Sequence, residues 1–165
     1  MANIQVYMNL EKYSQLAFFL GLHTQEIQLL APYFAPQTWV AGTIIFEQDD
    51  YAEYLYLVIS GEVIIRFKPH DGPPMTVTHV QPGGIFGWSA AMNNPVYTSG
   101  AVCSLDSEVL RIRGTDLRML CDKNPDVGRK ILDRLAGVIA ERQHSRQGQV
   151  SSILASSMHT QKARN

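Results

Sequence analysis

The sequence has no long apolar run, no cysteine framework and no strong net charge. Its longest apolar stretch, Leu16 to Leu22, is far shorter than the roughly 20 residues of a membrane-spanning helix. Its first ten residues contain no Lys or Arg and no apolar segment typical of a signal peptide. Two cysteines, Cys103 and Cys121, are too few for a fold held by disulfides. We therefore expect a reduced, cytoplasmic protein without a membrane segment.

The formal net charge of -1 excludes a generally basic protein that coats nucleic acid, but the charges are unevenly placed. Up to residue 110 there are ten acidic and three basic residues, and from Arg111 onward there are eleven basic and five acidic ones. Between Gly72 and Leu105 there is no Asp, Glu, Lys or Arg at all. A binding site formed by this middle stretch would therefore bring no charge of its own.

Short strands separated by turn signals dominate residues 37–113, a rhythm typical of a β-sandwich. The predicted strands are Thr38 to Val40, Thr43 to Phe46, Tyr54 to Ile59, Val63 to Phe67, Met75 to Val80, Ile85 to Trp88, Tyr97 to Cys103 and Glu108 to Ile112. We predict a mainly β fold, an eight-stranded jelly-roll-like β-sandwich. Helices are expected before it, in residues 1–36, and after it, in residues 114–142.

The last predicted helix begins at Asn124-Pro125-Asp126, a cap, a proline at the first position and an acid in the first turn. It runs to about Glu141 or further, and its apolar residues fall on two faces. One face can pack on the strands. The other, formed by Ile131, Leu135 and Val138 with spacings of 4 and 3, is expected to contact a partner helix and form a homodimer. The tail, residues 143–165, is either a second short helix that docks or a frayed end.

The order of these elements is similar to that of a known family. Tyr56 to Val63 resemble its strand–Ser-Gly–strand hairpin, and Gly83, Phe86 and Gly87 resemble the approach to its phosphate-binding cassette. Over residues 14–142 the chain resembles the cyclic-nucleotide-binding domain of catabolite-activator-type bacterial regulators and of protein kinase A regulatory subunits. The resemblance implies a sensory or regulatory domain, and the helix from Asn124 corresponds to the family's dimerisation helix.

The segment after the long helix is too short for the helix-turn-helix that DNA-binding regulators of this type carry. We therefore expect a stand-alone, single-domain form of this family that lacks the DNA-binding domain. The segment after Glu141 contains four basic residues that are expected to be solvated, namely Arg142, Arg146, Lys162 and Arg164. We expect no specific DNA binding and a role exerted through contacts with a partner protein.

The resemblance places a candidate cassette at residues 85–102. In the family this cassette reads Phe-Gly-Glu, then a small-residue turn, then an Arg. The Glu accepts the ribose hydroxyl and the Arg pairs with the cyclic phosphate. Here the Glu position is Trp88, and the Arg position is Tyr97, or Thr98 with a shift of one residue. The candidate ligand-binding residues are Phe86, Gly87, Trp88, Ser89, Ala90, Ala91, Tyr97 and Thr98.

The missing Glu and Arg predict weak binding of cyclic AMP or cyclic GMP, or none. Charged hydrogen bonds contribute about 1.5 to 3 kcal/mol each, so losing two weakens binding by roughly 10² to 10⁴-fold. The alternative is a functional cyclic-nucleotide receptor in which Arg66, Lys68 or Arg111 reaches the phosphate from another strand. We expect no cofactor other than this candidate nucleotide.

Two further readings of the pocket remain open. Trp88 either fills the cavity or lines a site for a neutral or weakly polar small molecule, together with Ser89, Tyr97, Thr98 and His79. The sequence does not name such a ligand.

An enzyme is the third alternative, because related folds include metal-dependent cupins, which need a His-x-His pair. The five histidines, His23, His70, His79, His144 and His159, form no such pair. The sequence also has no Walker loop and no nucleophile elbow. We therefore expect neither a metal site nor an enzyme.

Overall fold

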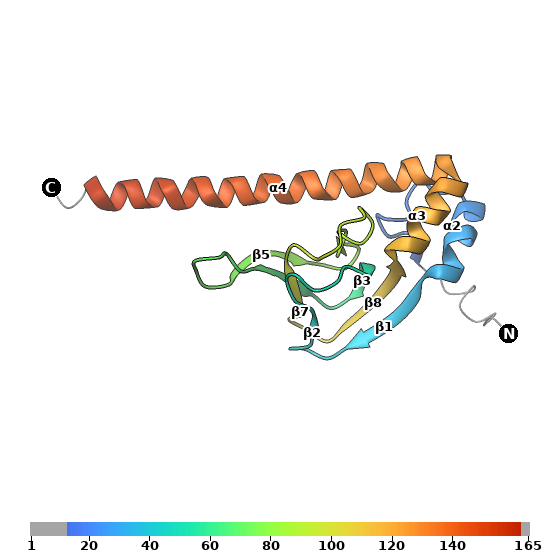
Figure 1. The fold of residues 1–165 in the computed structure, drawn as a ribbon, viewed down its shortest axis with the longest axis horizontal. Helices are drawn as coiled ribbons and strands as arrows, with labels where there is room; N and C mark the ends of the chain where they lie inside the picture. Colours follow the sequence, from blue (N-terminus) through green and yellow to red (C-terminus); the bar gives the residue numbers. More distant parts are fainter. Residues whose placement is uncertain (1–12, 163–165) are drawn as a thin grey trace.

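Two four-stranded antiparallel sheets form the body of the molecule (Figure 1). The computed structural model describes residues 13–162, with side chains described up to residue 144. One sheet has the strand order β1-β8-β3-β6 and the other β2-β7-β4-β5. The strands are β1 (Ala35–Trp39), β2 (Ile44–Phe46), β3 (Tyr54–Ser60), β4 (Val63–Phe67), β5 (Met75–Val80), β6 (Ile85–Phe86), β7 (Gly100–Cys103) and β8 (Ser107–Arg113). The predicted jelly-roll-like sandwich of eight strands is confirmed, and each strand overlaps its predicted range.

The turn between β3 and β4 depends on Gly61. Its φ is 85°, a left-handed conformation that glycine adopts without a steric penalty. A Cβ at this position would lie 2.3 Å from both the Asp106 carbonyl oxygen and Ser107 Oγ. The next amide, that of Glu62, donates to Ser107 Oγ at 3.1 Å. The Ser-Gly turn expected from the sequence therefore also fixes the connection between β7 and β8.

Strand β3 is buried on both faces and separates two apolar clusters. Tyr56 and Val58 point into the cluster between the two sheets. Leu55 and Leu57 point the opposite way, into a cluster covered by the helices and by the N-terminal segment. This alternation follows from the two-residue period of a strand. The sandwich therefore has one core inside it and a second core on its outer face.

In the described part of the chain, the helical segments that cover that outer face are α2 (Thr24–Leu30), η2 (Ala31–Tyr33), α3 (Gly114–Lys123) and α4 (Pro125–Lys162). α4 begins directly after Asn124, as predicted. It continues as one helix to Lys162, so the tail up to that residue extends α4 and is not a separate docked helix. Figure 1 shows α4 running beside the strands and projecting past them. Within residues 13–162, no helix combines the length and apolarity of a membrane span.

The structure corrects the assignment of the two faces of α4. Ile131 and Leu135 are 0% and 1% exposed and lie in the chain's own core, and Val138 packs against the same cluster. They are therefore not an open face for a partner helix. Their stripe faces inward because it meets apolar side chains of the N-terminal segment and the strands. Leu132, on the opposite side, is 51% exposed.

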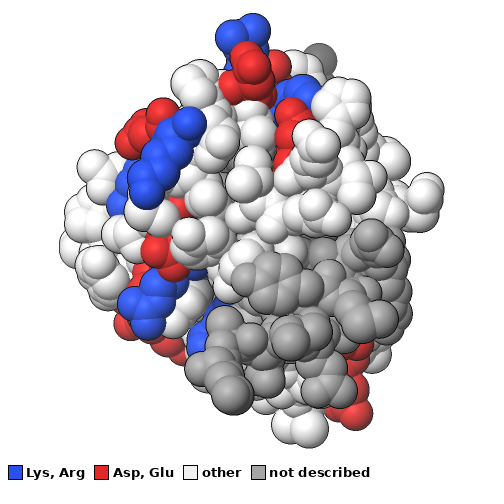
Figure 2. All heavy atoms as spheres, turned by 90° about the vertical axis from the view of Figure 1, so that its right-hand side faces the viewer, with Lys and Arg blue, Asp and Glu red and all other residues white. Residues whose placement is uncertain are grey.

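Opposite charges are interleaved at the end of the molecule beyond α2 and α3 (Figure 2). The described part of this face carries Lys and Arg next to Asp and Glu, with broad uncharged areas between them. Ion pairs link the two oppositely charged halves of the sequence. Lys130 Nζ of α4 lies 2.9 Å from both carboxylate oxygens of Glu26 in α2, and Arg113 at the end of β8 lies 3.1 Å from Glu53. The basic C-terminal half therefore partly neutralises acidic residues of its own chain.

Candidate functional site

The candidate cassette begins at Gly87, directly after β6. Its φ is 74°, and a Cβ there would lie 2.8 Å from the Tyr54 carbonyl oxygen and 2.9 Å from Cδ2 of Tyr56. Glycine is therefore required both for the backbone conformation and for the space. The chain then makes one tight turn, in which the Ala90 amide donates to the Gly87 carbonyl at 3.3 Å and the Met92 amide donates to the Trp88 carbonyl at 3.0 Å. This is the short turn expected from the small residues.

The end of this turn is anchored to α3. Ala90 and Ala91 are buried, and the Ala90 carbonyl accepts a hydrogen bond from the Arg118 guanidinium of α3. Gly114, the first residue of α3, approaches so closely that a Cβ on it would lie 2.1 Å from the Ala90 carbonyl oxygen. The two alanines are therefore packing residues that hold the cassette in place, and they do not line the cavity.

Tyr97, at the position of the family's Arg, is buried and makes its hydrogen bonds within the protein. It is 3% exposed, and its hydroxyl donates to the Tyr54 carbonyl at 2.7 Å and accepts from the Tyr54 amide at 3.0 Å. Its ring stacks on Phe46 with centroids 3.6 Å apart and an interplanar angle of 14°. Burial is the main cause that raises the pKa of the Tyr97 hydroxyl. This side chain offers an aromatic wall and no charge.

The wall continues through other aromatic residues into the core. Phe86 stacks on Tyr56 with ring centroids 4.8 Å apart and is 0% exposed. Phe86 therefore belongs to the packing between the two sheets and not to the cavity surface. Of the eight predicted site residues, the structure brings five to the cavity, and they are Gly87, Trp88, Ser89, Tyr97 and Thr98.

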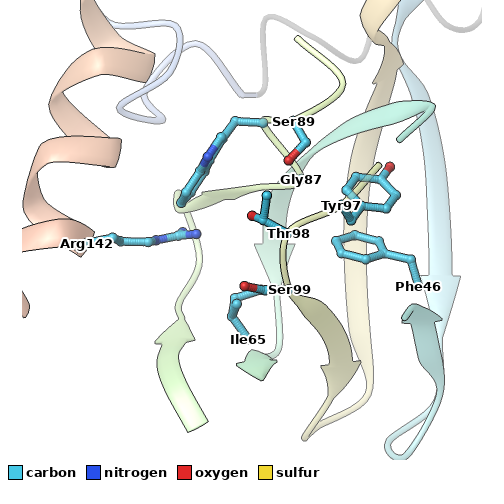
Figure 3. A pocket seen from close by; sticks show the side chains of 9 residues that line it. Phe46, Ile65, Gly87, Ser89, Tyr97, Thr98, Ser99 and Arg142 are labelled. Carbon is cyan, nitrogen blue, oxygen red and sulfur yellow. The ribbon is translucent and has the colours of Figure 1, made fainter. Parts of the chain in front are cut away.

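A small cavity of about 40 Å³ lies at the mouth of the cassette (Figure 3). Besides the five predicted residues, it is lined by Phe46, Ile65, Ser99 and Arg142. A single water needs roughly 10 to 15 Å³ measured in the same way, so the cavity holds a few waters or one small ion. A nucleotide would have to displace a lining side chain.

Arg142 reaches this cavity from α4 (Figure 3). Its guanidinium carbon lies 4.4 Å from the centroid of the Trp88 ring, within the range of a cation–π interaction. It also donates to the carbonyl oxygen of Ile85 in β6. Burial lowers the pKa of the Arg142 guanidinium to about 10, which leaves it charged at neutral pH. Among the residues whose side chains the structure describes, none forms an ion pair with it.

The structure therefore corrects the expectation that Arg142 is a solvated residue of the tail. The signal lay in the spacing, because Ile131, Leu135, Val138 and Arg142 follow one another at intervals of 4, 3 and 4 and share one face of the helix. The predicted face consists only of Ile131, Leu135 and Val138, and Arg142 is expected in the solvated tail. Because that face packs against the core, Arg142 on the same face lies against Trp88 of the cassette.

The bases expected to reach in from other strands do not line the cavity. The Arg111 guanidinium lies over the Tyr54 ring, 4.2 Å from its centroid, and the backbone of Lys68 is bonded to the side chain of Gln48 on another part of the surface. His79, also expected near the pocket, is exposed instead, and its Nδ1 lies 3.0 Å from Glu62 Oε1.

Trp88 is expected from the sequence either to fill the cavity or to line it. Its side chain packs against the core on the helix side and also lines the cavity.

In the described part of the chain, no group of three or more His, Cys, Asp or Glu side chains is arranged so that it could hold a metal ion. Both cysteines are free, and burial raises the pKa of each thiol.

The sandwich, the short cassette turn and the long closing helix together define the class of fold to which this chain belongs. The family model described as "Cyclic nucleotide-binding domain" matches residues 36–124. The chain therefore belongs to the cyclic-nucleotide-binding domain family, as its resemblance predicted.

Three similar proteins illustrate this relationship. The cyclic AMP receptor protein of Thermus thermophilus is 32% identical over 124 residues, which cover 74% of this chain and 57% of that protein. A solved structure of a putative cyclic nucleotide-binding protein from Geobacter metallireducens is 27% identical, with a TM-score of 0.72, over 81% of this chain and 97% of that one. The regulatory subunit of a cAMP-independent protein kinase A from Trypanosoma brucei, 18% identical, shares the fold with a TM-score of 0.74 over 89% of this chain and 52% of its own. The chain spans about half the length of the curated relatives it matches.

Proposed function

We propose that this chain is a non-enzymatic sensor domain whose cassette binds cyclic AMP or cyclic GMP weakly or not at all. The observation that carries the proposal is the occupation of both key positions of the cassette by aromatic residues. Tyr97 uses its hydroxyl on the Tyr54 backbone, and Trp88 carries the Arg142 guanidinium on its ring. Neither can replace a carboxylate that accepts a ribose hydroxyl or an arginine that pairs with phosphate.

Thermal unfolding with and without 1 mM cyclic nucleotide tests this proposal. A receptor with a dissociation constant of about 10 μM would be stabilised by roughly 2.7 kcal/mol at that concentration, which raises Tm by about 5 to 10 °C in a domain of this size. We expect a shift below about 1 °C for cyclic AMP and for cyclic GMP. A shift of several degrees with either nucleotide would overturn the proposal.

One observation supports a second candidate, a functional cyclic-nucleotide receptor with a displaced phosphate ligand. Arg142 is a charged guanidinium at the cassette, although it comes from α4 and not from a strand. Binding of this kind requires the Trp88 ring to give up the guanidinium and the cavity to widen. Micromolar binding of cyclic AMP that disappears in Arg142→Gln would establish this candidate in place of the first.

We also infer that the chain forms a homodimer through the outward face of α4. Leu132 is half exposed, and Ala136 and Ile139 follow it at spacings of 4 and 3, the interval of a helix–helix seam. This face replaces the one formed by Ile131 and Leu135, which is used within the chain. A role exerted through contacts with a partner protein fits a sensor of this kind. Leu132→Glu, which places a charge on this outward face, tests the dimer.

A further inference from the structure

The cavity at the cassette is lined by a cationic side chain, that of Arg142, and by no acidic one. Arg142 donates to one backbone carbonyl, that of Ile85, and its face rests on Trp88. A guanidinium has five N–H donors, and in the described part of the chain no carboxylate lies within ion-pair distance of it. Removing a charge from water costs free energy unless an opposite charge or several hydrogen bonds replace the lost hydration. Among the described residues, the charge of Arg142 is therefore not matched by an opposite charge at the cavity.

The other polar groups at the cavity are hydroxyls. Ser89 is 5% exposed, and it lines the cavity together with Thr98 and Ser99. Figure 3 shows these three residues and Arg142 arranged around the same space. Hydroxyls donate to anions as readily as they accept from cations, and no acidic side chain lines this space. The lining is thus electropositive and rich in donors.

The size of the cavity limits what can enter. With about 40 Å³, it accommodates a group of a few heavy atoms while Trp88 and Arg142 keep their positions. Arginine recognises carboxylates and phosphates with particular strength because its planar fork matches two oxygens at once.

We propose that the cassette binds a small oxyanion, a carboxylate or a phosphate group, through the guanidinium of Arg142 and the hydroxyls of Ser89, Thr98 and Ser99. This inference rests on the proposed sensor function and names the ligand chemistry of its site. Because the cation belongs to α4, occupancy of the cavity is transmitted to that helix directly. Because the same cation lies on the Trp88 ring, occupancy also changes the surroundings of this indole.

Trp88 provides the readout in a Trp39→Phe variant, in which it is the only tryptophan. The probes are sodium phosphate and sodium acetate, with sodium chloride at equal ionic strength as the reference. We expect a saturable change in Trp88 emission with phosphate, acetate or both, and none with chloride. The identity of the effective anion distinguishes a phosphate ligand from a carboxylate ligand. A response that is the same for all three salts, or that does not saturate, overturns the oxyanion site.

Variants locate the binding group. Arg142→Gln should weaken binding of the effective anion by roughly 10- to 100-fold, as expected for the loss of a charged hydrogen-bond donor. Arg129→Gln removes an exposed arginine from the same helix and should leave binding unchanged. Thr98→Val alters an exposed lining residue without touching the core, so its expected loss of affinity can be measured even if Arg142→Gln folds poorly. Equal binding in wild type, Arg142→Gln and Thr98→Val would exclude the site.

Cyclic AMP, tested alongside, separates this inference from the function on which it rests. Micromolar binding of cyclic AMP would overturn the proposed function, and retained, Arg142-dependent binding of phosphate would still support the oxyanion site. Absence of a response to phosphate and acetate would overturn the oxyanion site alone.

Discussion

The guanidinium carbon of Arg142 lies 4.4 Å from the centroid of the Trp88 ring. This contact joins the long helix α4 to the cassette, two segments separated by more than fifty residues of sequence. It places the cavity's one lining cation, within the described chain, on the helix that leads away from the sandwich. A molecule that pairs with this guanidinium would therefore contact α4 directly.

The hydroxyl of Tyr97 should stabilise the fold. Tyr97→Phe keeps the ring that stacks on Phe46 and leaves the amide and the carbonyl of Tyr54 without their partner. We expect the free energy of unfolding to fall by about 1 to 3 kcal/mol, measured by urea denaturation. Tyr51→Phe, at a ring that is 72% exposed, is the matched control and should change stability by less than about 0.5 kcal/mol. Equal stability of the two variants would contradict this role of the Tyr97 hydroxyl.

Alanine substitutions at Gly87 and Gly42 should distinguish the cost of backbone strain from the cost of a steric clash. Both have positive φ, 74° and 86°, but a Cβ on Gly42 meets nothing within 4 Å, whereas one on Gly87 meets Tyr54 and Tyr56. Gly42→Ala should cost about 1 to 2 kcal/mol for the left-handed conformation. Gly87→Ala should cost about 1 to 3 kcal/mol more because it also forces the cassette away from β3. Chemical denaturation of both variants provides the comparison, and equal losses would show that the close approach at Gly87 has no cost.

The two faces of α4 should respond differently to substitution. Leu132→Glu places a charge on the outward face, so we expect the dimer to dissociate while the fold stays intact. Leu135→Ala removes a core side chain and should lower the free energy of unfolding by about 2 to 5 kcal/mol. Sedimentation velocity and thermal unfolding distinguish the two effects. A dimer that persists in Leu132→Glu would contradict the outward face as the seam.

A carboxylate in the turn between β3 and β4, that of Glu62, should make stability depend on pH. Hydrogen bonds from Ser104, His79 and Gln81 hold the pKa of Glu62 at about 2, below its ordinary value of 4.5. The folded state therefore binds this proton less readily than the unfolded state does. Its stabilising contribution is complete above pH 4.5 and is lost as the pH falls through 4.5 towards 2.

Denaturation at a series of pH values checks this expectation. Glu62→Gln should show a shallower loss of stability than the wild type between pH 4.5 and 2. Ser104→Ala should lie between the two because it removes the strongest hydrogen bond to the carboxylate. Parallel curves for wild type and Glu62→Gln would refute the linkage.

The strands could be predicted because their signals are local. Alternating apolar residues and Gly or Pro turns mark each of the eight, and the cassette turn follows from the small residues after Trp88. What the sequence left undetermined is which helix face meets the sandwich. Ile131 and Leu132 are adjacent and both apolar, and only the apolar side chains of the N-terminal segment and the strands decide that the first is buried. The place of Arg142 is undetermined for the same reason, since a charged residue at the end of an apolar stripe is as compatible with a solvated position as with a buried one.

The central claim is that this cassette lacks the two groups that hold a cyclic nucleotide. Calorimetric titration of cyclic AMP into the wild type and into the double variant Trp88→Glu/Thr98→Arg tests it most directly. The double variant restores a carboxylate and a guanidinium at lining positions, which could recover roughly 10² to 10⁴-fold in affinity. We predict no saturable heat for the wild type and measurable binding for the double variant. A low-micromolar dissociation constant for the wild type would contradict the claim.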